Sequence, residues 1–162
     1  YAYNALGVAE LAAANPEAAT AALEQALQIS RDVRAGQETA IFTLAHLAEV
    51  MLARGDAARA REHVAQAVRE ASEHHVPTSE CFVRIVEARV FLAEGDVTRA
   101  ASSLDRSLAL VESTGARCFE PFARVERARL GDDGELREGE LRRARELFAE
   151  IGASERVRAI AG

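Results

Sequence analysis

The stretch Arg54-Gly55-Asp56-Ala57-Ala58-Arg59-Ala60 decides the fold, because its pattern returns forty residues later as Glu94-Gly95-Asp96-Val97-Thr98-Arg99-Ala100. Each copy reads Gly-Asp, three further residues, and Ala. The glycine permits a tight turn, and the aspartate suits the N-cap of the helix that follows. A weaker copy, Asn15-Pro16-Glu17-Ala18-Ala19, stands near the start of the chain. The sequence therefore predicts a helix-turn-helix unit that repeats with a period of about 40 residues.

The composition agrees with closely packed helices. Apolar residues make up 49% of the 162 residues, but aromatic residues make up only 5% and there is no tryptophan. Alanine supplies much of the apolar fraction, whereas a β-sandwich would need more β-branched and aromatic side chains. The length suits one domain with a substantial core.

Charge and cysteine content argue against several classes of protein. The net charge is −6 with no basic stripe, which argues against direct binding of nucleic acid. No apolar run is long enough for a membrane helix, and the alanine-rich start, which contains Glu10, does not read as a signal peptide. Cys81 and Cys118 lack the spacing of a disulfide framework or a zinc site, so we expect free thiols in a reducing cytoplasm. The chain begins without Met in mid-pattern, and we expect it to be a piece of a longer protein.

Apolar residues at helical spacing predict nine helices in succession. We expect them at residues 1–14, 17–33, 38–53, 57–73, 79–93, 97–112, 119–130, 135–151 and 153–161. The expected inward positions of the first and third helices are Tyr3, Leu6, Ala9, Ala13, Leu44, Leu47, Ala48 and Met51. One hairpin cannot bury its apolar stripe alone, so neighbouring hairpins must stack.

At these residues the chain resembles the tetratricopeptide family. The Leu-Gly signal of that family's first helix matches Leu6-Gly7 and, with Ala in place of Gly, Leu47-Ala48. The small-large-small pattern of its second helix is matched at Ala19/Leu23/Ala26, Ala60/Val64/Ala67, Ala100/Leu104/Ser107 and Ala144/Phe148/Ile151. The resemblance implies an all-α, right-handed solenoid of about four hairpins in one domain. The units would span approximately 1–36, 37–77, 78–115 and 116–152, with a capping helix at 153–162.

The chain departs from the family pattern in two respects. Its period is about 40 residues rather than about 34. In the third and fourth units, Arg84, Glu87, Arg124 and Arg127 occupy positions that are normally large and apolar. Either the packing face rotates there, or these charges pair between neighbouring repeats. Longer repeats of this kind are similar to those in the C-terminal regions of large bacterial regulators, which join them to an ATPase, cyclase, kinase or DNA-binding module.

The resemblance implies a partner-binding concave face formed by the first helix of each unit. Phe42, Phe82 and Phe122 recur at intervals of 40, and Tyr1 stands near the equivalent place in the first unit. A column of aromatic side chains there would anchor an extended peptide or a helix. The alternative is that these phenylalanines belong to the core.

One turn further along the same face lie Glu49, Arg89 and Arg129. Together with Asn4 and His46, they would give the face a mixed charge, more acidic at one end and more basic at the other. Such polarity would orient a partner of complementary charge. The alternative is that these residues form an ordinary solvated helix surface.

The sequence shows no catalytic, cofactor-binding or metal-binding motif. His74 and His75 are neighbours, which point about 100° apart on a helix and do not converge. His46 and His63 lie one per helix, and we expect no acidic or cysteine partner at metal-ligand spacing. The Arg54-Gly55-Asp56 tripeptide is explained by its place in the turn. No phosphate-binding loop, His-Glu-x-x-His or Gly-x-Ser-x-Gly motif is present.

Acidic side chains are expected to pair with arginines on helix surfaces. Glu138 with Arg142 and Glu140 with Arg143 are examples at helical spacing.

These patterns favour a non-enzymatic protein-interaction module, the sensor or scaffold segment of a bacterial regulator. It would bind a peptide, a helix or a partner domain on its concave face, with no cofactor, no metal, no direct contact with nucleic acid and no membrane. One alternative is a small-ligand-sensing repeat domain that controls an attached effector, which predicts an enclosed polar pocket. Another is self-association through the exposed ends of the array.

Overall fold

The computed structural model describes residues 1–32, 36–131 and 133–160. Within these ranges the chain forms helices and no strand. The helices are α1 (Ala2–Ala12), α2 (Pro16–Asp32), α3 (Gln37–Ala53), α4 (Ala57–Glu73), α5 (Pro77–Ala93), α6 (Val97–Thr114), η1 (Arg117–Phe119, a 3₁₀ turn), α7 (Glu120–Arg127), α8 (Gly134–Glu150) and α9 (Ser154–Ile160). The predicted all-α class is therefore confirmed for the described part of the chain.

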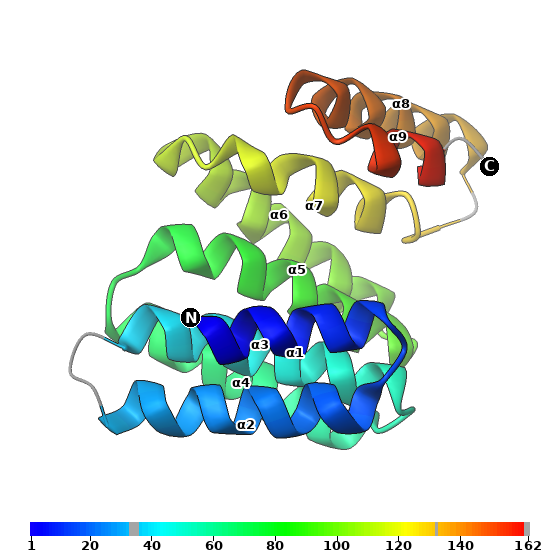
Figure 1. Ribbon diagram of the computed structural model, residues 1–162. Coiled ribbons are helices and arrows are strands. Elements are labelled where there is room, and N and C mark those ends of the chain that lie inside the picture. The colour runs from blue at the N-terminus through cyan, green and yellow to red at the C-terminus, as the bar shows by residue number, and fades with distance from the viewer. Residues whose placement is uncertain (33–35, 132, 161–162) are drawn as a thin grey trace.

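The helices pack in the order in which they follow one another. Each helix contacts the next, and in addition α1 contacts α3, α3 contacts α5, and α5 contacts α7. The succession runs from α1 and α2 in blue to α8 and α9 in orange and red (Figure 1). This packing is compatible with a helical repeat. It places α1, α3, α5 and α7 side by side, and we call the surface that they form the odd-helix face.

The helix boundaries follow the sequence prediction closely, with two differences. Pro77, which was expected to close the second unit, is instead the first residue of α5, where its missing N–H leaves no bond unmade. The seventh helix is shorter than predicted, because η1 precedes it and α7 ends at Arg127. The predicted helix ends at 33 and 161, the break at Ala35 and Asp132 of the last turn lie outside the described residues.

Glycine makes the short turns between paired helices. Gly55 and Gly95 have φ of +77° and +78°, in the left-handed region that costs L side chains free energy. The N–H of Asp56 donates to the carbonyl of Met51 at 2.9 Å, and the N–H of Gly55 donates to Leu52 at 2.9 Å. These two bonds form a Schellman motif, which satisfies the last carbonyls of α3.

The same aspartate begins the following helix. The carboxylate of Asp56 accepts a hydrogen bond from the N–H of Arg59 at 3.0 Å, and Asp96 accepts from Arg99 at 2.9 Å. One residue thus ends one helix through its backbone N–H and caps the next through its side chain. The predicted capping role of both aspartates is confirmed.

Two further turns have the same geometry without glycine. Ala14 and His75 have φ of +57° and +52°. The N–H of Asn15 donates to Glu10 at 2.9 Å, and that of Val76 donates to Ala71 at 3.1 Å. The turn is therefore a property of the backbone path, and glycine only lowers its cost.

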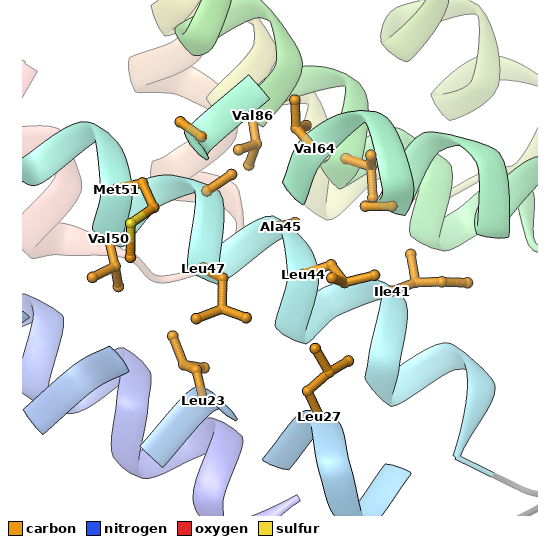
Figure 2. Close-up of a cluster of buried hydrophobic side chains, with 14 of the residues drawn as sticks. Leu23, Leu27, Ile41, Leu44, Ala45, Leu47, Val50, Met51, Val64 and Val86 are labelled. Atoms are coloured by element: carbon orange, nitrogen blue, oxygen red, sulfur yellow. The ribbon is translucent and has the colours of Figure 1, made fainter. Parts of the chain in front are cut away.

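The main core lies between α2, α3, α4 and α5. Figure 2 shows Leu23 and Leu27 of α2 pointing toward Leu47 and Leu44 of α3, with Val64 of α4 on the other side of α3. The predicted inward positions of α3 are confirmed, and so are the small-large-small positions of α2, α4 and α6. In α8, Ala144 and Phe148 are buried as predicted. Ile151 is 53% exposed because α8 ends before it.

Helix α1 packs through a different side from the one predicted. Tyr3, Leu6, Ala9 and Ala13 are exposed, and the buried residue of α1 is Gly7. A Cβ atom on Gly7 would lie 2.5 Å from Cγ of Leu23, so only glycine permits this approach of α1 to α2. The prediction was wrong because it gave weight to large side chains, whereas the contact depends on the absence of one.

The third hairpin, α5 with α6, contains a buried polar network. The guanidinium of Arg84 binds Glu80 and Glu87 of its own helix at 2.9 Å each. Across the hairpin, Ser103 donates to Glu87 at 2.9 Å and Arg106 lies 3.3 Å from Glu80.

The fourth hairpin, α7 with α8, repeats this arrangement forty residues later. Arg124 binds Glu120 at 2.8 Å and Glu140 of α8 at 2.9 Å. Arg127 lies 3.5 Å from Glu140 and 3.5 Å from Asp105 of α6. Most ion pairs of these residues thus lie within a hairpin, which neither predicted alternative named, and among them the Arg127–Asp105 pair alone joins two hairpins in the described chain. Glu87, Arg124 and Arg127 contact the paired helix, so these positions still face the inside of the hairpin.

Two predicted surface pairs on α8 are wrong. Glu140 faces α7 and is buried, so it pairs with arginines of that helix rather than with Arg143. Glu138 pairs with Arg145 at 2.6 Å rather than with Arg142.

The turn geometry predicts opposite effects of two matched substitutions. Gly55→Ala should lower the free energy of unfolding by about 1–2 kcal/mol, since no atom lies near the new methyl group and only the left-handed φ opposes it. Ala14→Gly should raise it by about 0.5–1 kcal/mol, because relief of the same strain outweighs the added entropy of the unfolded chain. Urea unfolding followed by circular dichroism measures both. A loss of stability in Ala14→Gly would contradict the shared geometry.

The buried network predicts a pH-dependent contribution from Glu80. Burial alone would raise the pKa of this carboxyl, but hydrogen bonds from Arg106 and Arg84 outweigh burial and lower it. A lowered pKa contributes stability that is present above the unfolded pKa of about 4.3 and is lost as the pH falls through the folded pKa. Glu80→Gln should therefore lower the free energy of unfolding by about 2 kcal/mol at pH 7. The difference from the parent should shrink steadily between pH 5 and pH 3.

Urea titrations at several pH values test the contribution of Glu80. Glu62→Gln, at an exposed position of α4, is the matched control and should change stability by less than about 0.5 kcal/mol at pH 7. A Glu80→Gln deficit that stays constant down to pH 3 would rule out the ionised pairing.

Candidate functional site

An aromatic cluster lies on the odd-helix face. The ring of Phe82 on α5 lies 5.7 Å from that of Phe42 on α3 and 5.0 Å from the imidazole of His46. On its other side, Phe82 lies 6.2 Å from Phe119 of η1. All four side chains are partly buried, and Phe82 also packs against the main core. The cluster is therefore neither wholly core nor wholly surface, since each ring buries part of its area and leaves part of it exposed.

Phe122 does not belong to this cluster. Its ring packs edge to face on Phe148 of α8, with centroids 5.0 Å apart, and the guanidinium of Arg156 lies 5.6 Å above it. Of the phenylalanines predicted at intervals of 40, Phe42 and Phe82 thus lie side by side, whereas Phe122 packs against α8 and α9. The further ring beside Phe82 is Phe119 of η1.

Four charged side chains form a ladder across three successive odd-numbered helices. Arg89 of α5 donates to Glu49 of α3 through Nη1 and to Glu126 of α7 through Nε, the latter at 2.8 Å. Arg129 donates to the other oxygen of Glu126 at 2.9 Å. We call Glu49, Arg89, Glu126 and Arg129 the ionic ladder. It joins the second, third and fourth hairpins on the face where a partner was expected.

Burial makes the ladder more than a set of surface pairs. Glu126 is only 2% exposed, whereas the side chain of Arg129 is 63% exposed. Burial alone would lower the pKa of Arg89, but the charges of Glu126 and Glu49 outweigh it and raise this pKa. Arg89 therefore stays charged and engaged at both ends. The alternative that these residues form an ordinary solvated helix surface holds for Arg129. It does not hold for the other members of the ladder, which are buried or partly buried.

Sequence reasoning missed Glu126, although a signal for it existed. Glu126 stands eighty residues after His46, at the same position of the forty-residue repeat. His46 was singled out as a candidate on this face, so the repeat alone places Glu126 there. His46 was also expected to lack an acidic partner, but its Nδ1 lies 2.9 Å from Glu49 three residues along the helix.

The N-terminal end of the odd-helix face is hollowed. A cavity of about 380 Å³ lies between α1 and α3 and is lined by Tyr1, Asn4, Phe42 and His46, among others. The side-chain oxygen of Asn4 is buried and accepts no hydrogen bond from any described residue. This cavity adjoins the aromatic cluster, because Phe42 and His46 belong to both.

The described residues show no sign of a metal centre or of a membrane span. No group of three or more His, Cys, Asp or Glu side chains in residues 1–32, 36–131 and 133–160 could hold a metal ion. In the same ranges, no helix combines the length and the apolar character needed to cross a bilayer.

In comparisons with known proteins, neither a protein-family model nor a curated protein sequence matches this chain. The likeness to tetratricopeptide repeats therefore stays a prediction from the sequence pattern. The site has to be understood from its own geometry.

The ladder predicts unequal effects of removing its two arginines. Arg89→Met should lower the free energy of unfolding by about 2–4 kcal/mol, because the buried carboxylate of Glu126 keeps only its exposed partner. Arg129→Met should cost less than about 1 kcal/mol, as an exposed pair does. The double variant Arg89→Met/Glu126→Met should recover part of the loss, since no buried charge remains unpaired. Equal costs for the two single variants would contradict the ladder.

Proposed function

We infer that this chain is a non-enzymatic docking module that binds a segment of a partner protein along the odd-helix face. The observation that supports this most is the partly exposed aromatic cluster of Phe42, His46 and Phe82. It is continuous with the cavity beside Asn4. The bound segment would be a peptide, a helix or an edge of a partner domain.

The chemistry of the face suits such a segment. Fully burying an exposed apolar or aromatic side chain contributes about 1.5–3 kcal/mol, so rings that are already partly covered can still gain a part of this from a partner. The buried oxygen of Asn4 is an acceptor without a donor among the described residues, and a backbone N–H of a docked segment would satisfy it.

The ionic ladder contributes to docking indirectly. It ties α3, α5 and α7 together on the face itself, which reduces the ordering needed when a partner binds. Arg89 already binds Glu49 and Glu126, so its charge is not available to a partner. At the centre of the face, the partner would therefore be recognised by the aromatic rings.

We extend the proposal to the architecture and the setting. The chain would be a right-handed, tetratricopeptide-like solenoid of about four hairpins with α9 as its cap. It would serve as the sensor or scaffold segment of a bacterial regulator in the cytoplasm. Consecutive helix packing, the recurring Gly-Asp turn and the buried small-large-small positions support the repeat architecture. The regulatory setting rests on the resemblance alone.

Selection from a random peptide display library tests the docking function. Peptides enriched on the folded protein should lose affinity about thirtyfold for Phe42→Ala, the effect of removing an aromatic hot spot worth about 2 kcal/mol. Phe91→Ala is the matched control. Phe91 is a partly buried ring of α5 that lies under the guanidinium of Arg99 and packs against the small core between α5, α6 and α7. Circular dichroism confirms that both variants are folded at the assay temperature.

Two outcomes would argue against docking on this face. One is that no peptide is enriched above the level found on an unrelated helical protein. The other is that the enriched peptides respond to Phe91→Ala as strongly as to Phe42→Ala.

A further inference from the structure

A second cavity lies at the C-terminal end of the odd-helix face. It has a volume of about 290 Å³ and is bordered by α7, α8 and α9. Three arginines line it, Arg89 of α5, Arg129 just beyond the end of α7, and Arg156 of α9. Among the described residues of its lining, Glu126 is the one carboxylate, and Phe122 and Phe148 form its apolar side.

The charge of this cavity is unusual for the protein. Three arginines and one glutamate line it, and Glu49 binds Arg89 from outside the lining, so one positive charge remains in excess although the chain as a whole has a net charge of −6. The larger cavity of about 540 Å³ between α6 and α7 differs in this respect. There, Arg117, Arg124 and Arg127 are matched by the three carboxylates Asp105, Glu112 and Glu120. Of these two cavities, the one beside α9 has the local excess of positive charge that would attract an anion.

The arginines retain donors for a ligand. Arg129 uses one terminal nitrogen, Nη1, for Glu126, and no other hydrogen bond of its guanidinium is formed with the described residues. Arg156 makes no ion pair within the described ranges, and it lies over the ring of Phe122. A guanidinium offers five N–H donors in a planar fork that matches a carboxylate.

The aromatic side of the cavity limits the ligand further. Phe122 and Phe148 meet edge to face at 88°, and Val125 and Ile160 lie beside them. The volume is at the lower limit of small-molecule sites, about 300–1,000 Å³, so the cavity suits a group of side-chain size.

We propose that this cavity binds a carboxylate carried on an aromatic or branched apolar body. The carboxylate would lie between Arg129 and Arg156, and the apolar body would pack against Phe122 and Val125. Two sources share this chemistry, a free organic acid and a glutamate next to an apolar residue in a peptide. The site does not depend on docking at the aromatic cluster, which lies toward the other end of the face.

Titration with matched probes, followed by backbone NMR, tests the site. The probes are 3-phenylpropanoate, its uncharged analogue 3-phenylpropanamide, and the blocked peptide acetyl-Gly-Glu-Phe-Gly-amide. At least one carboxylate probe should saturate and shift the amide signals of α9 and of the end of α7. The uncharged amide should bind at least about tenfold more weakly, and added salt should weaken binding of the carboxylate.

Variants assign the binding to Arg129 and Arg156, the two arginines with unused donors. Arg129→Gln and Arg156→Gln should each weaken binding of the carboxylate about tenfold. Arg158→Gln is the matched control, since Arg158 is an exposed arginine of the same helix that pairs with Glu155 and lies outside the cavity. All three positions are exposed, so folding should be unaffected.

The outcomes separate the two sources and can overturn the site. Saturation by 3-phenylpropanoate alone would identify a free acid as the ligand, and saturation by the peptide alone would identify a partner segment. Failure of both carboxylate probes to saturate would overturn the proposal. So would equal binding of the uncharged amide, or equal sensitivity to Arg158→Gln. None of these results bears on peptides selected at Phe42, so the two proposals fail separately.

Discussion

The structure depends on a turn in which one aspartate serves two helices. Its backbone N–H donates to a carbonyl at the end of the preceding helix, and its carboxylate caps the start of the next helix. The residue before the aspartate has a left-handed backbone conformation. Because Asp56 and Asp96 do both, only three residues join α3 to α4 and α5 to α6, and these two hairpins have the same turn geometry. Ala14 and His75 adopt that geometry at a cost in free energy, which shows that the packing of the hairpins demands it.

The turn sets which helices meet, and the odd-helix face follows from it. With α1, α3, α5 and α7 side by side, residues about forty positions apart come into contact. Where the residues in contact are aromatic, they form the aromatic cluster. Where they are charged, they form the ionic ladder, in which Arg89 binds Glu49 and Glu126. In the proposed function, the cluster would offer the exposed part of its rings to a partner. The ladder, buried at Glu126, holds the helices that present that area.

The sequence predicted most of the fold but only part of the site, for physical reasons. Helices and turns follow from local chemistry, and Gly55 with Asp56 shows it at a single turn. The side of α1 that packs against α2 is set by Gly7. A pattern of apolar side chains does not reveal a contact that depends on the absence of a side chain. Phe119 was not predicted beside Phe82, because it lies in a 3₁₀ turn that has no clear local pattern in the sequence. Glu140 was placed on the surface because spacing within a helix says nothing of the arginines of α7.

The central claim is that the odd-helix face is where a partner binds, and covalent capture by position tests it most directly. A photoreactive benzoylphenylalanine at Phe42, at Phe91 or at Glu62 of α4 can be irradiated with the selected peptide bound. The account predicts an adduct from position 42 and none above background from positions 91 and 62. Adducts of similar yield from position 62, on the even-numbered helix α4, would contradict it.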